Sequence, residues 1–117
     1  MPDFGENDIA IRRARRLIEN GQVVVSSDWT AVRPSDQAQD AFLEANSWEA
    51  YSSWHLGVDD DEQYDSKDRY GFPIGDFDQV HQSALVHAML MAERDGHTEV
   101  KLAAQDLLGR LQGTPGR

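Results

Sequence analysis

Apolar residues recur at helical spacing in four separate stretches of the chain. The first stretch predicts a helix over about residues 8–20, with Asn7 or Asp8 suited to cap its start. Gly21 is suited to end it, because glycine adopts the left-handed conformation without steric cost. One face of this helix is apolar and is expected to point inward: Ala10, Ile11, Ala14, Leu17 and Ile18.

Three further helices are expected. Ser35 can cap one that ends near Asn46. Asp78 can cap the next, which Gly96 ends, and Thr98 can cap the last. Because only residues 95–97 join the last two helices, we expect them to be antiparallel neighbours. The expected inward residues are Ala38, Ala41, Phe42 and Ala45 in the first of the three, Val80, Ala84, Leu85, Ala88, Met91 and Ala92 in the second, and Val100, Ala103, Ala104, Leu107, Leu108 and Leu111 in the third.

Two stretches have strand character. Three consecutive valines predict a short buried strand over residues 22–26. Residues 48–58 fit both helical spacing and strand alternation, and we favour a strand from about Tyr51 that pairs with residues 69–74. The expected fold is therefore α+β: about four helices packed on a short β-hairpin or small antiparallel sheet.

The predicted organisation is one domain over residues 1–117, with residues 1–6 and 113–117 frayed. Its core is expected to contain Trp48, Trp54, Phe72 and the last two helices. The chain has no cysteine, which excludes disulfides, thiolate nucleophiles and cysteine-ligated metal sites. The first ten residues lack a basic leader and an apolar run, so we predict a cytoplasmic protein without membrane attachment.

The net charge of −10 is concentrated in the middle of the chain. Residues 28–78 hold 13 acidic and 3 basic side chains, whereas the remaining residues are balanced. This distribution argues against direct DNA binding through the acidic middle, because phosphates would be repelled. The segment 59–65 suggests calcium, but an EF-hand frame from Asp59 has tyrosine where glycine and glutamate are needed. We interpret it as a solvated hairpin tip.

Four arginines between positions 12 and 16 form the one concentrated positive feature. Arg12, Arg13 and Arg16 lie away from the apolar face of the first predicted helix. They could grip an acidic partner or RNA, or they could form a solvated face that attracts the protein's own acidic middle.

Other candidate chemistry is weak. Ser83 and His87 are four residues apart on a predicted helix, but a helical serine lacks the turn and amides that acyl transfer uses. The GFPIGD segment does not suit phosphate, because proline removes an N–H donor and the following aspartates repel an anion. No catalytic residue is therefore predicted. A metal site is the alternative, with ligands drawn from His55, Asp76, Asp78 and His81.

Residues 70–85, YGFPIGDFDQVHQSAL, resemble an element of phage-associated and small uncharacterised bacterial proteins, in which an aromatic-Pro-Ile stretch precedes an Asp, a His and an Ala-Leu helix start. With WHLG at 54–57, the span 29–111 is similar to such proteins. The resemblance implies a strand-to-helix unit in which Pro73 fixes the turn and Asp76 or Asp78 closes the helix N-terminus. It implies no activity. The matching positions are Phe72, Pro73, Ile74, Asp76, His81, Ala84 and Leu85.

Together these features predict a non-catalytic acidic interaction or accessory protein, with a stress-related or phage-related role as the specific hypothesis. Its partner is expected to be another protein, and no cofactor is expected. The alternative function is metal binding or metal-dependent catalysis by the His/Asp set. The oligomeric state is left open. The residues expected to contact the partner are Arg12, Arg13, Arg16, Asp59, Asp60 and Asp61.

Overall fold

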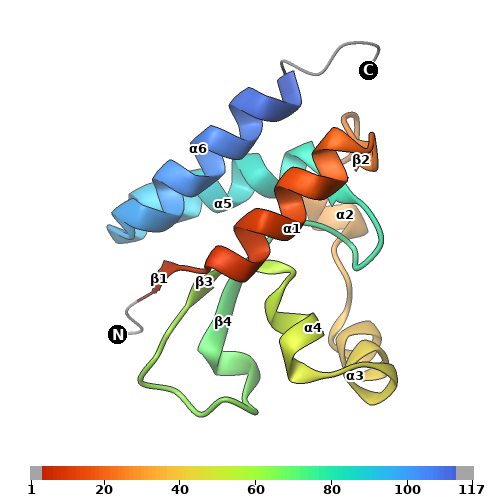
Figure 1. Cartoon of the computed structure of the whole chain (residues 1–117), viewed down its shortest axis with the longest axis vertical. Coiled ribbons are helices and arrows are strands. Elements are labelled where there is room, and N and C mark those ends of the chain that lie inside the picture. The colour runs from red at the N-terminus through yellow and green to blue at the C-terminus, as the bar shows by residue number, and fades with distance from the viewer. Residues whose placement is uncertain (1–3, 113–117) are drawn as a thin grey trace.

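The computed structural model describes residues 4–112 and has the expected α+β architecture, with six α-helices and a small three-stranded sheet in that range (Figure 1). In chain order the elements are β1 (Gly5–Glu6), α1 (Asp8–Glu19), β2 (Val23–Val24), α2 (Trp29–Val32), α3 (Asp36–Ala45), α4 (Trp48–Ser52), β3 (His55–Val58), the 3-10 turn η1 (Lys67–Arg69), β4 (Tyr70–Pro73), β5 (Val80–His81), α5 (Gln82–Asp95) and α6 (Thr98–Gln112). No helix among these residues is long and apolar enough to cross a membrane.

Two small sheets organise the strands. β1, β3 and β4 form an antiparallel sheet in that order, so the predicted pairing across the acidic loop is confirmed. β2 and β5 form a separate parallel pair, in which Val24 lies opposite His81. A single bridge between Gly75 and Val80 closes the turn that leads from β4 to β5. The parallel pair therefore places the segment that follows α1 beside the start of α5.

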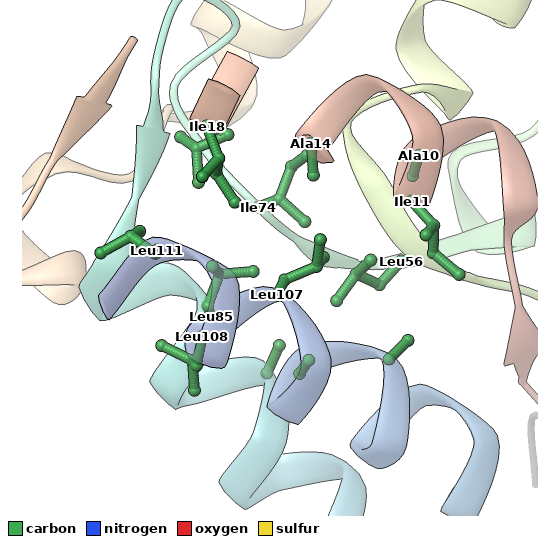
Figure 2. Packing of buried hydrophobic residues seen from close by; sticks show 14 of the residues in the cluster. Ala10, Ile11, Ala14, Ile18, Leu56, Ile74, Leu85, Leu107, Leu108 and Leu111 are labelled. Atoms are coloured by element: carbon green, nitrogen blue, oxygen red, sulfur yellow. The ribbon is translucent and has the colours of Figure 1, made fainter. Parts of the chain in front are cut away.

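The core lies where α1, α5 and α6 meet the antiparallel sheet. Figure 2 shows Leu56 and Ile74 between the inward side chains of α1 and those of α6. Every predicted inward residue of α1 and α6 is buried, and α5 and α6 pack directly on each other. Fully buried alanines at positions 10, 14, 88, 92 and 104 let the helices approach closely.

Several residues of α3 and α4 that were predicted to be buried are exposed or half-buried. Ala38, Ala41 and Ala45 of α3 are exposed, because this helix lies at the edge of the molecule (Figure 1). Its Phe42 is half-buried and stacks on Phe77, with ring centroids 4.2 Å apart. Trp48 is also only half-buried, since it covers Tyr51 and Tyr70 from the outside rather than entering the core.

Residues 48–58 contain both predicted structures in succession. Helix α4 comes first, capped by the Ser47 hydroxyl, and strand β3 begins at His55 rather than at Tyr51. The predicted strand over 22–26 shortens to Val23–Val24, which are half-buried, and Val25 is 48% exposed. Only one neighbouring strand, β5, covers this segment, which explains the incomplete burial.

Two predicted helix caps are wrong. Asn7 stands at the start of α1, but its side-chain amide donates to the backbone oxygens of Ser52 and His55 instead. Asp78 is exposed and lies four residues before α5, which begins at Gln82 with no side-chain cap. Val80 consequently belongs to β5 rather than to the helix. The Asn7 side chain is engaged in a long-range contact, and the Asp78 N–H donates to Asp76 within a turn, so other contacts replace local capping.

The N-terminal segment is ordered further than predicted. Gly5 and Glu6 pair with β3, and Phe4 makes edge contacts with the rings of Phe72 and His97. The expectation of fraying over residues 1–6 is therefore wrong for residues 4–6. Residues 1–3 and 113–117 lie outside the described part of the chain.

Replacing Gly109 by alanine is expected to stabilise the protein by about 0.5–1 kcal/mol. Gly109 lies on the exposed side of α6, and an added Cβ would meet nothing within 4 Å. Alanine reduces the conformational entropy of the unfolded chain without a new contact in the folded one. Urea unfolding measures the change, and a lower midpoint at an unchanged slope would contradict it.

Candidate functional site

The three predicted arginines line one groove of about 390 Å³ between α1 and α4. Arg12, Arg13 and Arg16 are all exposed. The Arg13 guanidinium lies over the Trp54 ring, 5.6 Å from its centroid, a geometry typical of cation–π contact. Glu49 and Ile9 line the same groove, so it combines positive charge with one carboxylate and apolar surface.

The arginine face does not pair with the acidic middle. In residues 4–112, Arg12 contacts Asp8 at 3.1 Å, and Arg15, on another side of α1, reaches Asp106 of α6 at 3.5 Å. No ion pair within that range joins Arg13 or Arg16 to a carboxylate. Exposed pairs such as Arg12–Asp8 are weak and exchange readily with solvent or a partner. The groove therefore keeps positive charge available.

The acidic loop is exposed over residues 60–65, as expected of a solvated hairpin tip, but Asp59 at its start is buried. Asp59 is only 6% exposed; its N–H donates to the Arg69 carbonyl, and its carboxylate accepts from the N–H of Asp61. Asp60 is exposed and contacts the Arg69 guanidinium at 3.2 Å. Asp59 consequently holds the turn and is not available to a partner, whereas Asp60 and Asp61 remain at the surface.

The four residues of the metal alternative are divided between different surroundings. His55 is buried, and its Nδ1 contacts the Tyr51 carbonyl oxygen at 2.8 Å. Asp78 is exposed. Asp76 and His81 do meet, with 2.9 Å between Oδ2 and Nε2. Across the described residues, no three His, Asp or Glu side chains gather in a way that could hold a metal ion.

A second cluster was not predicted. His81 uses both ring nitrogens: Nε2 faces Asp76, and Nδ1 lies 2.8 Å from Ser27 Oγ. Ser27 Oγ in turn lies 2.9 Å from Ser83 Oγ, at the start of α5. The result is a continuous chain of hydrogen bonds from a carboxylate through an imidazole to two hydroxyls. We call Asp76, His81, Ser27 and Ser83 the serine–histidine cluster.

The backbone positions each member of this cluster. Pairing of β2 with β5 brings His81 beside Val24, and Ser27 follows three residues later. Asp76 is fixed because its Oδ1 accepts from the N–H groups of Asp78 and Gln79. Burial would raise the Asp76 pKa, but these two bonds and the one to His81 together hold the pKa below its usual value. Asp76 is therefore ionised at neutral pH beside the imidazole.

The turn that carries Asp76 contains a strained residue. Phe77 has φ of 71°, which a bulky side chain rarely adopts. Its ring stacks on Phe42 and makes an edge contact with Trp54, and this packing offsets the strain. Such outliers often mark functional turns, and this one holds the carboxylate of the serine–histidine cluster in place.

The cluster could not be predicted from the sequence, because Ser27 and His81 are 54 positions apart. The hydroxyl of Ser83 contacts Ser27 rather than His87, its neighbour on the predicted helix. Asp76 and His81 are candidates from the sequence, although as metal ligands. In comparisons with known proteins, no protein-family model, curated protein or solved structure matches the chain.

Proposed function

We propose that this protein is a cytoplasmic interaction protein that binds an acidic segment of another protein through the groove between α1 and α4. The single observation that carries the proposal is the gathering of Arg12, Arg13 and Arg16 along one concave surface, without competing ion pairs from the acidic middle. A phage-related or stress-related role is part of the proposal, and the resemblance of residues 70–85 to phage-associated proteins supports the first of the two.

The surroundings of the groove favour a protein over RNA. Its lining includes Ile9 and Leu17 beside the arginines, which suits a peptide that carries both apolar and acidic side chains. Glu49 in the same groove and the net charge of −10 oppose a polyphosphate chain. Guanidinium groups can contact carboxylates through two parallel hydrogen bonds, so arginine rather than lysine suits this task.

Reversing the charge of the groove is expected to weaken binding of an acidic peptide at least about tenfold, because complementary charges set both recognition and association rate. The probe is a fluorescein-labelled peptide of alternating glutamate and leucine, and the measurement is fluorescence anisotropy. The variant combines Arg12→Glu, Arg13→Glu and Arg16→Glu. The affinity of the unaltered protein should also fall as salt rises from about 50 to 500 mM, because exposed charges are screened.

A charge-matched control keeps the test specific. Arg33→Glu, Arg94→Glu and Arg110→Glu change the net charge equally at exposed positions outside the groove. This control should bind within about twofold of the unaltered protein if the groove is the site. Equal loss in both triple variants would refute a localised site, and tighter binding of an oligouridylate than of the peptide would refute a protein partner.

The metal alternative has narrower support, since only Asp76 and His81 of its four residues are in contact. Imidazole and carboxylate suit zinc, manganese and nickel. Calorimetric titration with each ion tests for a metal site. Stoichiometric binding that disappears in His81→Gln and persists in His87→Gln would favour metal binding over binding of an acidic protein segment.

A further inference from the structure

We propose that the serine–histidine cluster is a hydrolytic site for short, uncharged acyl esters, with Ser27 as nucleophile, His81 as general base and Asp76 as the residue that orients the imidazole. This activity would be separate from the arginine groove, which lies on α1 and α4. The proposal rests on three observations: the order of the hydrogen bonds, the groove onto which Ser27 opens, and the burial of the base.

The hydrogen bonds assign the protons. An ionised Asp76 carboxylate is an acceptor only, so His81 Nε2 must carry the proton of their 2.9 Å contact. In the neutral imidazole Nδ1 is then an acceptor, and Ser27 Oγ–H donates to it across 2.8 Å. This separation is within the range that general-base catalysis requires. The carboxylate thereby selects the tautomer that can remove the serine proton.

The base is rigid and shielded from water. His81 is 4% exposed, and its ring lies against that of Trp29, with centroids 5.7 Å apart. Its backbone is held from two sides, by β2 and by the Ile74 carbonyl, which accepts the His81 N–H. A fixed, largely buried imidazole interacts strongly with the adjacent carboxylate and needs little reorganisation during proton transfer.

Ser27, in contrast, reaches the surface. Ser27 and Ser83 line an open groove of about 510 Å³ whose walls are mainly apolar. Val25 and Leu90, on two of these walls, are 48% and 54% exposed. Exposed apolar side chains around a few convergent polar groups are typical of a binding site for a small apolar ligand. A short acyl chain suits the apolar lining of this groove.

A second hydroxyl lies beside the nucleophile. Ser83 Oγ, in the first turn of α5, is 2.9 Å from Ser27 Oγ. Within the proposal, Ser83 is a positioning residue for Ser27. The donors assigned to the oxyanion are the N–H groups of the same first turn, whose N-cap residue His81 makes no side-chain cap hydrogen bond.

The reaction balances with water as the only co-reactant. Ser27 Oγ attacks the ester carbonyl carbon while its proton moves to His81 Nδ1, and Asp76 stabilises the imidazolium. The tetrahedral intermediate then collapses, the bond to the alcohol oxygen breaks, and Nδ1 returns the proton to the leaving alcohol. Water attacks the acyl-serine by the same proton transfers, releasing the carboxylic acid and restoring the Ser27 hydroxyl.

The test has two readouts on the whole 117-residue chain. Hydrolysis of p-nitrophenyl butyrate is followed by absorbance, and labelling by a fluorophosphonate is mapped to single residues by mass spectrometry. Ser27→Ala should lower kcat/KM at least about 100-fold and abolish labelling at position 27. Ser26→Ala, which alters the exposed neighbouring serine, should leave both unchanged.

Asp76→Asn should retain Ser27 but favour the wrong tautomer, and is expected to lower kcat about 100-fold or more with little change in KM. Circular dichroism and the melting temperature verify that each variant is folded. The proposal is overturned if the folded, unaltered protein is not labelled at Ser27. It is equally overturned if Ser27→Ala hydrolyses the ester as fast as Ser26→Ala.

Discussion

Replacing Gly75 by alanine is expected to destabilise the protein by about 3 kcal/mol or more and to lower its melting temperature by roughly 10–20 °C. The reason is a close backbone approach. A Cβ at this position would lie 2.1 Å from the Gln79 carbonyl oxygen and 2.9 Å from the Trp54 ring. The first neighbour is main chain and cannot rotate away, so the turn must open.

The destabilisation would involve more than the clash between the new Cβ and the Gln79 carbonyl oxygen. The Asp76 N–H donates to the same Gln79 carbonyl at 3.2 Å, and the Gly75–Val80 bridge closes the turn. Opening the turn would separate Val80 from β2 and shift His81, the next residue. A loss of several kcal/mol is a large fraction of the free energy that holds a domain of this size together.

Thermal unfolding followed by circular dichroism measures the effect, with Gly109→Ala as the matched control. Both variants add one methyl group, but the Cβ at 109 meets nothing within 4 Å. The two substitutions should therefore move the melting temperature in opposite directions. A Gly75→Ala variant that melts within about 2 °C of the unaltered protein would show that the turn yields without cost.

The parts of the fold that sequence predicted well are those with a strong local signal. The apolar stripes of α1 and α6 repeat over three turns or more, and burial of one such face dominates helix stability. The pairing of β3 with β4 followed from two apolar segments around one polar loop. Each signal lies within a short stretch of chain.

The failures have identifiable physical causes. The alanines of α3 recur at helical spacing, but a methyl group gains little from burial and does not force the helix inward. Asp78 is a good cap by type, yet Asp76 captures the Asp78 N–H and ends the turn before any helix starts. In both cases the residue types were compatible with the prediction, but the burial of alanine gained too little in one and a local turn replaced the helix start in the other.

The candidate sites divide in the same way. The arginine groove was foreseeable in part, because Arg12, Arg13 and Arg16 share one helix face. The serine–histidine cluster was not, because it depends on a parallel pairing of two-residue strands far apart in the chain. Such short strands leave almost no periodic pattern. Asp76 and His81 carried a usable signal as a close acid–base pair, and Ser27 carried none.

A second large effect is expected from pH, through His55. Burial lowers the pKa of this imidazole to about 4, and the opposing hydrogen bond to the Tyr51 carbonyl raises it less. In the unfolded chain the pKa is near the ordinary value of about 6.5. His55 is only 6% exposed, and its ring lies 4.4 Å from the Tyr51 ring, centroid to centroid, so an added proton would be poorly solvated.

The sign of the effect follows from which state binds the proton. Well above a pH of about 6.5 neither state is protonated at His55, and its contribution to stability is constant. As pH falls from about 6.5 to about 4, the unfolded chain binds a proton that the folded protein excludes, so stability decreases. The expected loss across this window is about 3 kcal/mol, after which both states are protonated.

Urea unfolding at several pH values between 4 and 7 measures this loss, and His55→Gln isolates it. The variant should be less stable than the unaltered protein at pH 7, because a well-packed ring is lost. Its stability should then fall much less as pH decreases. Carboxylates such as Asp76 contribute equally to both proteins, so the difference between the two curves reports His55 alone. His87→Gln, which alters a half-buried histidine of α5, should retain the loss assigned to His55. Parallel curves for His55→Gln and the unaltered protein would show instead that the folded state accommodates a charged imidazole at this position.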